Sequence, residues 1–445
     1  MALSKINPTK LSSWKKLVQQ FDKENNHHIN DFFKEENNRV DEFSVSWKDF
    51  YVDFSKNRLS NNTFNLLISL CKETNLKDNI DKYFNGSFIN ETESRAVLHT
   101  ALRSSGNDGV NKTLNKIINI SDKINNGDRL GYTGKKITDV VNIGIGGSHL
   151  GPEMVTEALS YYSKGIKAHF ISNIDSDFTS KILEKINPET TIFIIVSKTF
   201  STIETIENAN KIRAWFIDNA GEDFINDHFI CISNNIEATK KFGVSSENIL
   251  SIPEWVGGRF SLWGSVGLVI SIVIGSKNFK DFLRGANEMD IHFKSSPFEK
   301  NISVVLALIS IWYNNFFKCE TEVVIPYSQF LSKLPDYLQQ ASMESNGKSI
   351  DRSGEKVNYE TGSIVWGSTG TNAQHAFFQL MHQGTKIIPS DFIAFKKSLY
   401  NDSNQHKILN SNFLAQTNAL MMGKSTSGED IHKNIDGNKP SNSIV

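Results

Sequence analysis

Three side chains of this sequence are of types that transfer protons or stabilise charge, and they stand beside turns or helix ends. Glu344 lies near the end of an expected helix in QQASMESNGKS, where a carboxylate could act as a general base. Arg259 follows two glycines in EWVGGRFSLWG, and a guanidinium there could stabilise negative charge developing on oxygen. His375 lies in the first turn of an expected helix and could transfer protons near neutral pH. Taken singly, they are also compatible with a solvated glutamate, an interdomain salt bridge and a packed histidine.

A cluster of hydroxyl side chains follows the most apolar expected strand, TIFIIVS, which ends at Ser197. The residues that come next, before an expected helix, are Lys198, Thr199, Ser201 and Thr202. Hydroxyls, free N–H groups and a helix N-terminus together favour a phosphate monoester. A capping box explains Ser201 and Glu204, but not four hydroxyls with a lysine at the carboxyl end of a parallel strand. We therefore favour a phosphate site over a simple helix cap.

The loop NIGIGGSHLGP lies between an expected strand and its helix, and it admits three readings. A glycine-rich turn of this kind brings backbone N–H groups towards an anion, but it can also be a plain tight turn. A dinucleotide-binding GxGxxG pattern starting at Gly144 would need glycine at position 149, which is His149. Asp175 also comes later than the roughly 20 residues that this pattern requires. A dehydrogenase is therefore the weakest of the three readings.

The elements that must position these residues have the sequence pattern of α/β domains. From about residue 138, short apolar runs alternate with amphipathic stretches, and five strands separated by four helices predict a doubly wound sheet. Because TIFIIVS is continuously apolar, we expect it to be a central strand covered on both faces. The second half repeats the theme with EVVIPYS, GSIVWGS and TKIIPSDFIAF as strands. LSKLPDYLQQASMES and NAQHAFFQLMHQG read as helices there.

The first hundred residues read as mostly helical, with residues 41–55 a possible exception and Glu93–Arg103 a good helix. We expect three regions in all. They are an N-terminal helical region of residues 1–104 that packs on the second domain, a first α/β domain of residues 105–275 that holds the phosphate loop, and a second α/β domain of residues 276–445.

Composition excludes several other classes of protein. The 48 basic and 49 acidic residues nearly cancel, which argues against a nucleic-acid binder. Three widely spaced cysteines and the lack of HExxH give no zinc pattern, and a sparse cysteine count fits a reducing compartment. The longest apolar stretches, Leu262–Ile274 and Ile302–Trp312, are too short to span a bilayer and read as buried helices. The N-terminus has no apolar signal region, so we expect a cytoplasmic protein without membrane or nucleic-acid partners.

Together, five motifs resemble the glucose-6-phosphate isomerase (phosphoglucose isomerase) family. They are IGIGGSHLGP, SKTFSTIET, VGGRFSLWG, LQQASMESNGK and GTNAQHAFFQLMHQGT, in the family's order and approximate spacing. ESRAVLHTALR and the terminal HKNIDGNKPSNSIV match as well, so the resemblance runs from about residue 40 to the last residue. The joint match is specific, although each motif alone would be weak.

The resemblance implies a fold of two sugar-isomerase-type (SIS) doubly wound parallel-sheet domains with added N-terminal helices. It implies a homodimer with shared active sites and no metal or organic cofactor. The implied reaction is the interconversion of glucose 6-phosphate and fructose 6-phosphate through a cis-enediolate, a step of glycolysis and gluconeogenesis.

The resemblance also implies a role for each matching residue. Glu344 looks like the base, Arg259 like the group that stabilises the enediolate, and His375 like a ring-opening residue contributed across the dimer. The residues implied to bind the phosphate are Ser197, Lys198, Thr199 and Thr202. Those implied to line the sugar side are Gly147, Ser148 and Gln340, the last being four residues before Glu344 on the same helical face.

The sequence departs from the family pattern in several places. His149 stands where the family commonly has Asp, Ser368-Thr369 replaces Glu-Pro, and Ala373 replaces a common Gly. The family's C-terminal helical segment, whose lysine helps ring opening, has no counterpart after PSNSIV. This truncation predicts a chain that binds sugar phosphates but turns over poorly. The alternative function is a catalytically impaired sugar-phosphate-binding module.

Overall fold

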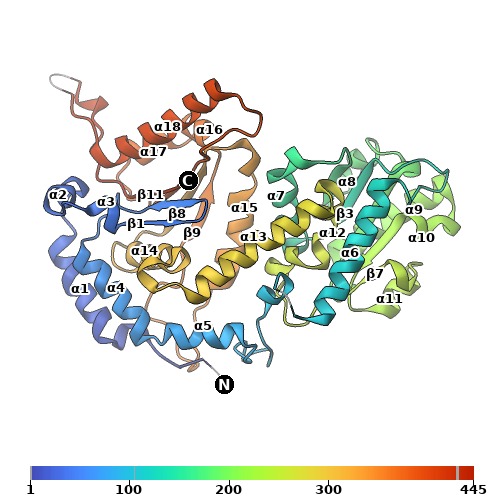
Figure 1. Ribbon diagram of the computed structural model, residues 1–445, viewed down its shortest axis with the longest axis horizontal. Coiled ribbons are helices and arrows are strands. Elements are labelled where there is room, and N and C mark those ends of the chain that lie inside the picture. Colours follow the sequence, from blue (N-terminus) through green and yellow to red (C-terminus); the bar gives the residue numbers. More distant parts are fainter. Residues whose placement is uncertain (1–2, 105, 427–429) are drawn as a thin grey trace. The chain divides into compact units, whose positions relative to one another are not determined.

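The computed structural model describes residues 3–104, 106–426 and 430–445, and it divides into two compact units (Figure 1). Unit 1 is Tyr83–Asp290, and unit 2 combines residues 3–82 with Ile291–Val445. The boundaries fall inside α5 (Leu76–Phe84) and α13 (Ser276–Ser295). The three regions expected from the sequence remain a prediction about domain boundaries.

Unit 1 is built on a five-stranded parallel sheet with the strand order β4-β3-β5-β6-β7. Its strands are β3 (Asp139–Ile143), β4 (Lys167–Ile171), β5 (Thr191–Val196), β6 (Phe229–Ile232) and β7 (Ile249–Leu250). All six residues of β5 are buried, as expected for a central strand between two helical layers. The α/β character predicted from the alternating pattern is thereby confirmed.

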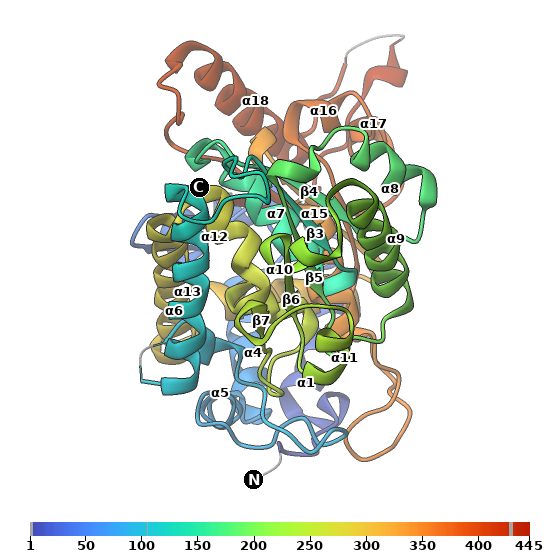
Figure 2. The same ribbon diagram turned by 90° about the vertical axis from the view of Figure 1, so that its right-hand side faces the viewer.

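Helices cover both faces of this sheet. Figure 2 shows α6 and α12 on one side and α8 and α9 on the other. The α-helices that lie wholly within unit 1, in the part of the chain that the structure describes, are α6 (Asp108–Asn126), α7 (Leu150–Ala158), α8 (Ser176–Leu183), α9 (Ile203–Ala220), α10 (Ile225–His228), α11 (Ile236–Lys241) and α12 (Leu268–Ile274). On the α8–α9 side, Val141, Phe193 and Phe216 belong to one buried cluster. Burial of such aromatic and aliphatic side chains supplies most of the driving force that holds the layers together.

Unit 2 is built on a six-stranded mixed sheet with the order β1-β2-β11-β10-β8-β9. Its strands are β1 (Ser44–Trp47), β2 (Phe50–Asp53), β8 (Thr321–Pro326), β9 (Ile364–Gly367), β10 (Ser390–Ile393) and β11 (Ser441–Ile444). The four strands β9, β8, β10 and β11 are parallel, and the β1–β2 hairpin adds to β11 in antiparallel fashion. Segments from both ends of the chain thus complete one sheet.

Helices cover the sheet of unit 2 as well. The α-helices that lie wholly within unit 2, among the described residues, are α1 (Ser12–Glu24), α2 (Ile29–Glu35), α3 (Arg39–Glu42), α4 (Asn61–Glu73), α14 (Ile302–Asn315), α15 (Leu334–Leu338), α16 (Gly370–Gln374), α17 (Phe378–Gln383) and α18 (Ser403–Met422). Val323 and Phe392 point to the α16–α18 side, where they pack with Phe413. The neighbouring Glu322 faces α14 and accepts a hydrogen bond from Ser310. This alternation is the period of two that a strand imposes.

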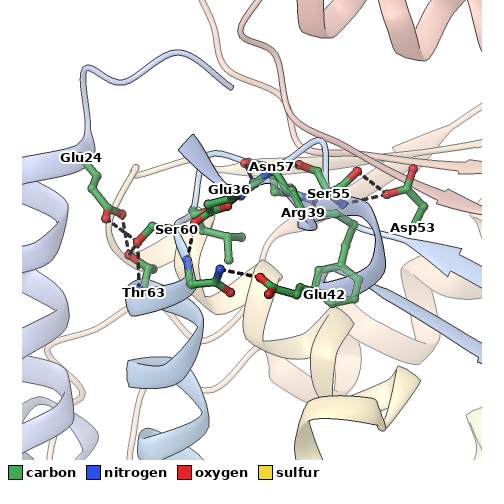
Figure 3. A network of polar contacts seen from close by, with 12 residues as sticks. Glu24, Glu36, Arg39, Glu42, Asp53, Ser55, Asn57, Ser60 and Thr63 are labelled. Carbon is green, nitrogen blue, oxygen red and sulfur yellow. Dashed lines mark hydrogen bonds and ion pairs between the residues drawn. The ribbon is translucent and has the colours of Figure 1, made fainter. Parts of the chain in front are cut away.

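A buried arginine ties the N-terminal segment of unit 2 to the loop after β2 (Figure 3). Arg39 is 1% exposed, and its guanidinium donates to the carbonyl oxygens of Ser55, Asn57 and Leu59 at 2.8–3.0 Å. Glu36 supplies the opposite charge, and the Phe43 ring lies 4.4 Å from Arg39 Cζ. Because three carbonyl oxygens of the loop accept from it, this guanidinium helps to fix the loop after β2.

One predicted helix does not form. Only His99–Leu102 of the Glu93–Arg103 segment is helical, as a short 3₁₀ helix, and Arg95 makes a β-bridge with Asn90. Tertiary contacts take the place of the local helix propensity: the Leu98 N–H donates to the carbonyl oxygen of Trp255, and Arg103 forms an ion pair with Asp290, far along the chain. The expected helix over Leu262–Ile274 is also shorter, since regular α-helix begins at Leu268.

Candidate active site

The glycine loop after β3 is fixed by close main-chain packing. A Cβ atom on Gly147 would lie 2.1 Å from the carbonyl carbon of Gly258 and 2.5 Å from the backbone nitrogen of Arg259. A Cβ on Gly144 would lie 2.8 Å from Ser148 Cβ and 3.1 Å from the carbonyl oxygen of Val196. Only glycine therefore fits at these two positions. The packing brings the main chain of Arg259 directly against the loop that carries Gly147 and Ser148.

The hydroxyl-rich loop begins at the same edge of the sheet. β3 and β5 are neighbouring parallel strands with Ile143 opposite Ile195, so the loops after them start side by side. In the second loop, Ser197 Oγ donates to Thr202 Oγ1 at 3.3 Å. Ser197 itself is 4% exposed. Carboxyl ends of parallel strands are where open α/β sheets bind ligands.

Phe200 gives the hydroxyl-rich loop its sharp turn. Its φ of 53° is left-handed, which a bulky residue adopts only when its surroundings enforce it. Its ring packs edge-on against Phe242, with 5.8 Å between centroids, and belongs to the margin of the unit 1 core. The Phe200 ring therefore anchors the loop on the core of unit 1, while the hydroxyl groups of the residues on either side stay near the surface.

The predicted capping box at Ser201 and Glu204 is not formed. Thr202 is the N-cap residue of α9, and within the described residues no side chain caps this helix. Ser201 Oγ instead lies 2.7 Å from Thr199 Oγ1. The loop hydroxyls pair with one another because the left-handed turn at Phe200 directs Ser201 away from the helix N-terminus. The helix start is left open to an anion, which its N–H groups and dipole would attract.

Lys198 is held beside a carboxylate. Its Nζ lies 3.1 Å from Glu254 Oε2 and 3.3 Å from the Glu254 carbonyl oxygen. Hydrogen bonds from Lys198 and then Asn234 lower the pKa of Glu254. Glu254 is largely exposed, so this ion pair orients the lysine more than it stabilises the fold.

Arg259 lies in the 3₁₀ helix Gly258–Trp263 and is partly buried. Its Cζ is 5.2 Å from the centroid of the Phe260 ring. Arginine stacks readily on aromatic faces, and such stacking restricts its rotamers.

Seven of the ten predicted site residues lie in unit 1, at or beside the carboxyl edge of its sheet.

The other three predicted residues lie in unit 2. Gln340 and Glu344 both fall within a π-helix, Gln339–Glu344, which directly continues α15. Within the described residues, Gln340 Oε1 is buried and accepts no hydrogen bond, whereas Glu344 is exposed. Single π-turns inside helices occur frequently at functional sites. The sequence predicted a helix here, but not its wider turn.

His375 lies where a predicted continuous helix is broken. It is the C-cap of α16, and α17 starts only at Phe378, so the expectation that His375 occupies the first turn of one long helix was wrong. Gln374, just before it, donates to the Tyr327 hydroxyl at 2.9 Å. That bond fixes the end of α16, and the His375 side chain stays exposed.

Sequence reasoning missed several residues that support the unit 1 loops. Asn142 is fully buried in β3, and its Nδ2 donates to the carbonyl oxygen of Ser148 at 3.0 Å. An amide within the apolar run VVNIG was the available signal, because a buried polar group needs a partner. Phe200 and Glu254 carried no comparable signal, since nothing in their local pattern distinguishes them.

The structure bears on metal binding and membrane insertion only for the described residues. Among these, no group of three or more His, Cys, Asp or Glu side chains is arranged to hold a metal ion. No helix in the same part of the chain is long and apolar enough to cross a membrane.

Comparison with known proteins identifies relatives across the whole chain. The phosphoglucose isomerase family model matches residues 53–445. The chain is 50% identical to glucose-6-phosphate isomerase of Christiangramia forsetii, with 100% of this chain and 87% of that protein aligned. It is 48% identical to glucose-6-phosphate isomerase of Buchnera aphidicola subsp. Schizaphis graminum, over 100% of this chain and 85% of that protein. A crystal structure of a glucose-6-phosphate isomerase from Chlamydia trachomatis is similar with a TM-score of 0.88 and 27% identity, covering 99% of this chain and 87% of that one.

Proposed function

The chain belongs to the phosphoglucose isomerase family, and from this premise we propose that it interconverts glucose 6-phosphate and fructose 6-phosphate. The observation that carries the proposal is the packing of Gly147 on Gly258 and Arg259, beside the start of the hydroxyl-rich loop. An aldose–ketose isomerisation of a sugar phosphate needs both an anion-binding loop and a cation for developing oxygen charge. Unit 1 has candidates for both at one edge of its sheet.

The phosphate is bound by the loop after β5. Ser197, Thr199 and Thr202 offer hydroxyl groups, and the open start of α9 offers N–H groups and the positive end of the helix dipole. Lys198 adds a positive charge that Glu254 orients. Holding the phosphate fixes the sugar carbons relative to the reacting groups, which converts binding energy into rate.

The ring of the sugar must open before the carbons can react. We assign this step to His375: breaking the C1–O5 bond takes a proton from the O1 hydroxyl and delivers one to O5. The imidazole lies exposed at the end of α16, outside the core of unit 2, where a substrate can reach it. Imidazole is suited to both transfers because its ordinary pKa is close to neutrality.

Glu344 is the base of the isomerisation itself. It removes the C2 proton of the open aldose, the C–H electron pair forms the C1=C2 bond, and O1 takes the negative charge. Arg259 stabilises that enediolate, and one such donor is worth about 3–4 kcal/mol in comparable oxyanion sites. Glu344 then returns the proton to C1, while the O2 hydroxyl gives its proton to O1 and becomes the ketose carbonyl.

The sugar hydroxyls face the remaining candidate residues. Gly147 and Ser148 line one side of the sugar, with the backbone held by Asn142. Gln340 Oε1 accepts no hydrogen bond within the described residues, and it would accept one from a sugar hydroxyl. Hydrogen bonding of an otherwise unpaired buried oxygen would favour substrates with a hydroxyl at the matching position.

The assembly and location that we propose are a homodimer with shared active sites, in the cytoplasm. The exposed His375 fits a role across a subunit interface. Cys71, Cys231 and Cys319 are all unpaired and buried, which suits a reducing compartment.

The experiment that tests this function is conversion of fructose 6-phosphate by the full 445-residue chain, with Glu344→Gln beside it. Loss of a general base predicts a fall in kcat of about 10²–10⁴-fold. The matched control is Glu355→Gln, an exposed glutamate of the following loop, which should keep the wild-type rate. Equal turnover by wild type and Glu344→Gln would remove Glu344 from the mechanism. Saturable sugar-phosphate binding without turnover in any variant would instead indicate a binding module.

A further inference from the structure

The segment Glu93–Arg103, ESRAVLHTALR, has no role in the reaction described above, yet it packs on the turn that carries Arg259. The Leu98 N–H donates to the carbonyl oxygen of Trp255 at 3.2 Å. A Cβ on Gly264, just after the 3₁₀ helix Gly258–Trp263, would lie 3.2 Å from Leu102 Cδ2. The segment and the turn are therefore in close contact at both ends of the 3₁₀ helix.

An aromatic stack joins this segment to Arg259. The His99 imidazole lies parallel to the Phe260 ring, with 4.2 Å between centroids and an interplanar angle of 8°. The same Phe260 ring lies 5.2 Å from Arg259 Cζ. Tyr83 fixes the imidazole through a hydrogen bond of 2.7 Å between its hydroxyl and His99 Nε2. Phe260 is thus held by His99 and in turn contacts the guanidinium.

A second anchor holds the other end of the turn. Arg103 forms two hydrogen bonds of 2.6 Å with the two carboxylate oxygens of Asp290. Its Cζ lies 4.7 Å from the centroid of the Trp263 ring, which also stacks on Phe282. Bidentate arginine–carboxylate pairs with little exposure are geometrically specific. Phe260 and Trp263 are consequently fixed from one side, while Gly147 fixes Gly258 from the other.

Electrostatics around His99 favour an uncharged ring. Burial, followed by the charges of Arg103 and Arg259, lowers the pKa of His99 to about 3. A neutral imidazole can stack on Phe260 without placing a third positive charge beside the two guanidinium groups. Burial also raises the pKa of the Tyr83 phenol, so the hydroxyl keeps its proton and its hydrogen-bonding role.

We propose that His99 is a positioning residue for Arg259: stacked on Phe260 and fixed by Tyr83, it sets the guanidinium against the site at which enediolate charge develops. The inference rests on the proposed function, because it assigns His99 a role only through Arg259. His99 itself touches neither substrate nor reacting atoms. A small displacement of a group such as the Arg259 guanidinium can lower the rate by about 10²-fold, so a residue that positions it has a measurable effect on kcat.

The test compares His99→Leu and His99→Phe with the wild type by steady-state kinetics on fructose 6-phosphate. His99→Leu removes both the planar ring and the bond to Tyr83, and we expect kcat to fall by about 10–100-fold with KM changed less than about threefold. His99→Phe keeps the stack and should recover most of that loss. The matched control is His228→Leu: His228 is fully buried in the same unit and contacts Phe216, but lies away from the Arg259 turn. It should lower thermal stability without a fall in kcat.

A double-mutant cycle with Arg259→Ala separates a positioning role from a structural one. If His99 acts through Arg259, then His99→Leu has no more than about a twofold further effect on kcat in the Arg259→Ala background. Independent, multiplicative effects in the cycle would overturn the inference, as would wild-type kcat in folded His99→Leu. Wild-type kcat in Arg259→Ala alone would instead overturn the proposed role of Arg259, so the two failures are distinguishable.

Discussion

The candidate residues of the two units are held in different ways. In unit 1, Gly147 is locked against the main chain of Gly258 and Arg259, and the next loop is bent through the left-handed Phe200. In unit 2, Glu344 stands at the end of a π-helix and His375 at a break between two helices, both with exposed side chains. One set is fixed by close main-chain packing, whereas the other is presented on helix irregularities.

This difference separates two requirements of the proposed reaction. Stabilising a phosphate and an enediolate depends on dipoles and charges that are already oriented, because reorientation during the reaction would cost free energy. Proton transfer instead depends on the identity and reach of one side chain. We therefore expect unit 1 to be sensitive to changes in backbone space, and unit 2 to be sensitive mainly to changes in side-chain chemistry.

The largest effect should follow from filling backbone space in unit 1. Gly147→Val would place carbon atoms where the Gly258 main chain lies, so Arg259 must move away from the glycine loop. We expect kcat/KM to fall by about 10³-fold or more, comparable to losing an oxyanion-site donor completely. Gly285→Ala is the matched control. Gly285 lies in helix α13, and a Cβ atom added there would have no other heavy atom within 4 Å. Activity of folded Gly147→Val within tenfold of wild type would contradict rigid packing as the basis of the unit 1 site.

A smaller effect should distinguish phosphate binding from proton transfer. Thr202→Val removes a loop hydroxyl that accepts from Ser197, and we expect the Kd for inorganic phosphate to rise by about tenfold, as for the loss of one hydrogen bond to a charged group. Glu344→Gln and His375→Gln should leave that Kd unchanged, since both residues act on the sugar. Titration calorimetry of the four proteins measures this directly. Phosphate binding that weakens equally in all three variants would contradict the proposed division between the units.

The smallest effect on activity, but a clear one on stability, concerns the sheet cores. β5 of unit 1 is wholly buried and carries no ionisable side chain, whereas β10 of unit 2 carries Asp391, which accepts a hydrogen bond from Asn442 at 2.7 Å. Burial, opposed by that hydrogen bond and reinforced by nearby Glu322, raises the pKa of Asp391 to about 6 from 3.8. The folded state holds this proton more tightly than the unfolded state does. The protonated Asp391 therefore contributes fully to the free energy of unfolding below about pH 4, and this contribution is lost as the pH rises through about 6.

Asp391→Asn should therefore stabilise the protein above that range while keeping the bond from Asn442. We expect a gain of about 2–3 kcal/mol in the free energy of unfolding near pH 7.5, because the pKa of Asp391 rises from 3.8 to about 6 on folding, and almost none near pH 4. Urea unfolding of both proteins at the two pH values is the measurement. A gain of the same size at both would show that titration of Asp391 is not its source.

Much of unit 1 could be predicted because its signals are local. The run TIFIIVS has five apolar residues in succession between Thr191 and Ser197, which favours a strand covered on both faces, and the glycine and hydroxyl loops follow strands directly. The fold class and the family were both confirmed. The capping box failed because the backbone turn at Phe200, a long-range consequence of packing on Phe242, redirected Ser201.

Unit 2 was less predictable because its decisive features are not local. The strand Ser441–Ile444 has a polar sequence and exists because β2 and β10 pair with it on either side. The π-turn at Gln339–Glu344 and the break at His375 carry no special residue type. Likewise, Glu93–Arg103 reads as a helix until its His99 and Arg103 side chains are seen to contact Phe260 and Asp290. Tertiary contacts decided these elements over local propensity.

The most direct test of the central claim is to follow the hydrogen at C2 of glucose 6-phosphate during turnover by the 445-residue chain. If Glu344 carries one proton between neighbouring carbons, deuterium from C2 should appear partly at C1 of fructose 6-phosphate and partly in water, because a carboxylic acid exchanges with solvent. Glu344→Gln should abolish both the transfer and the exchange. Complete retention of deuterium at C1 without any exchange, or unchanged transfer in Glu344→Gln, would contradict an enediolate mechanism that uses this base.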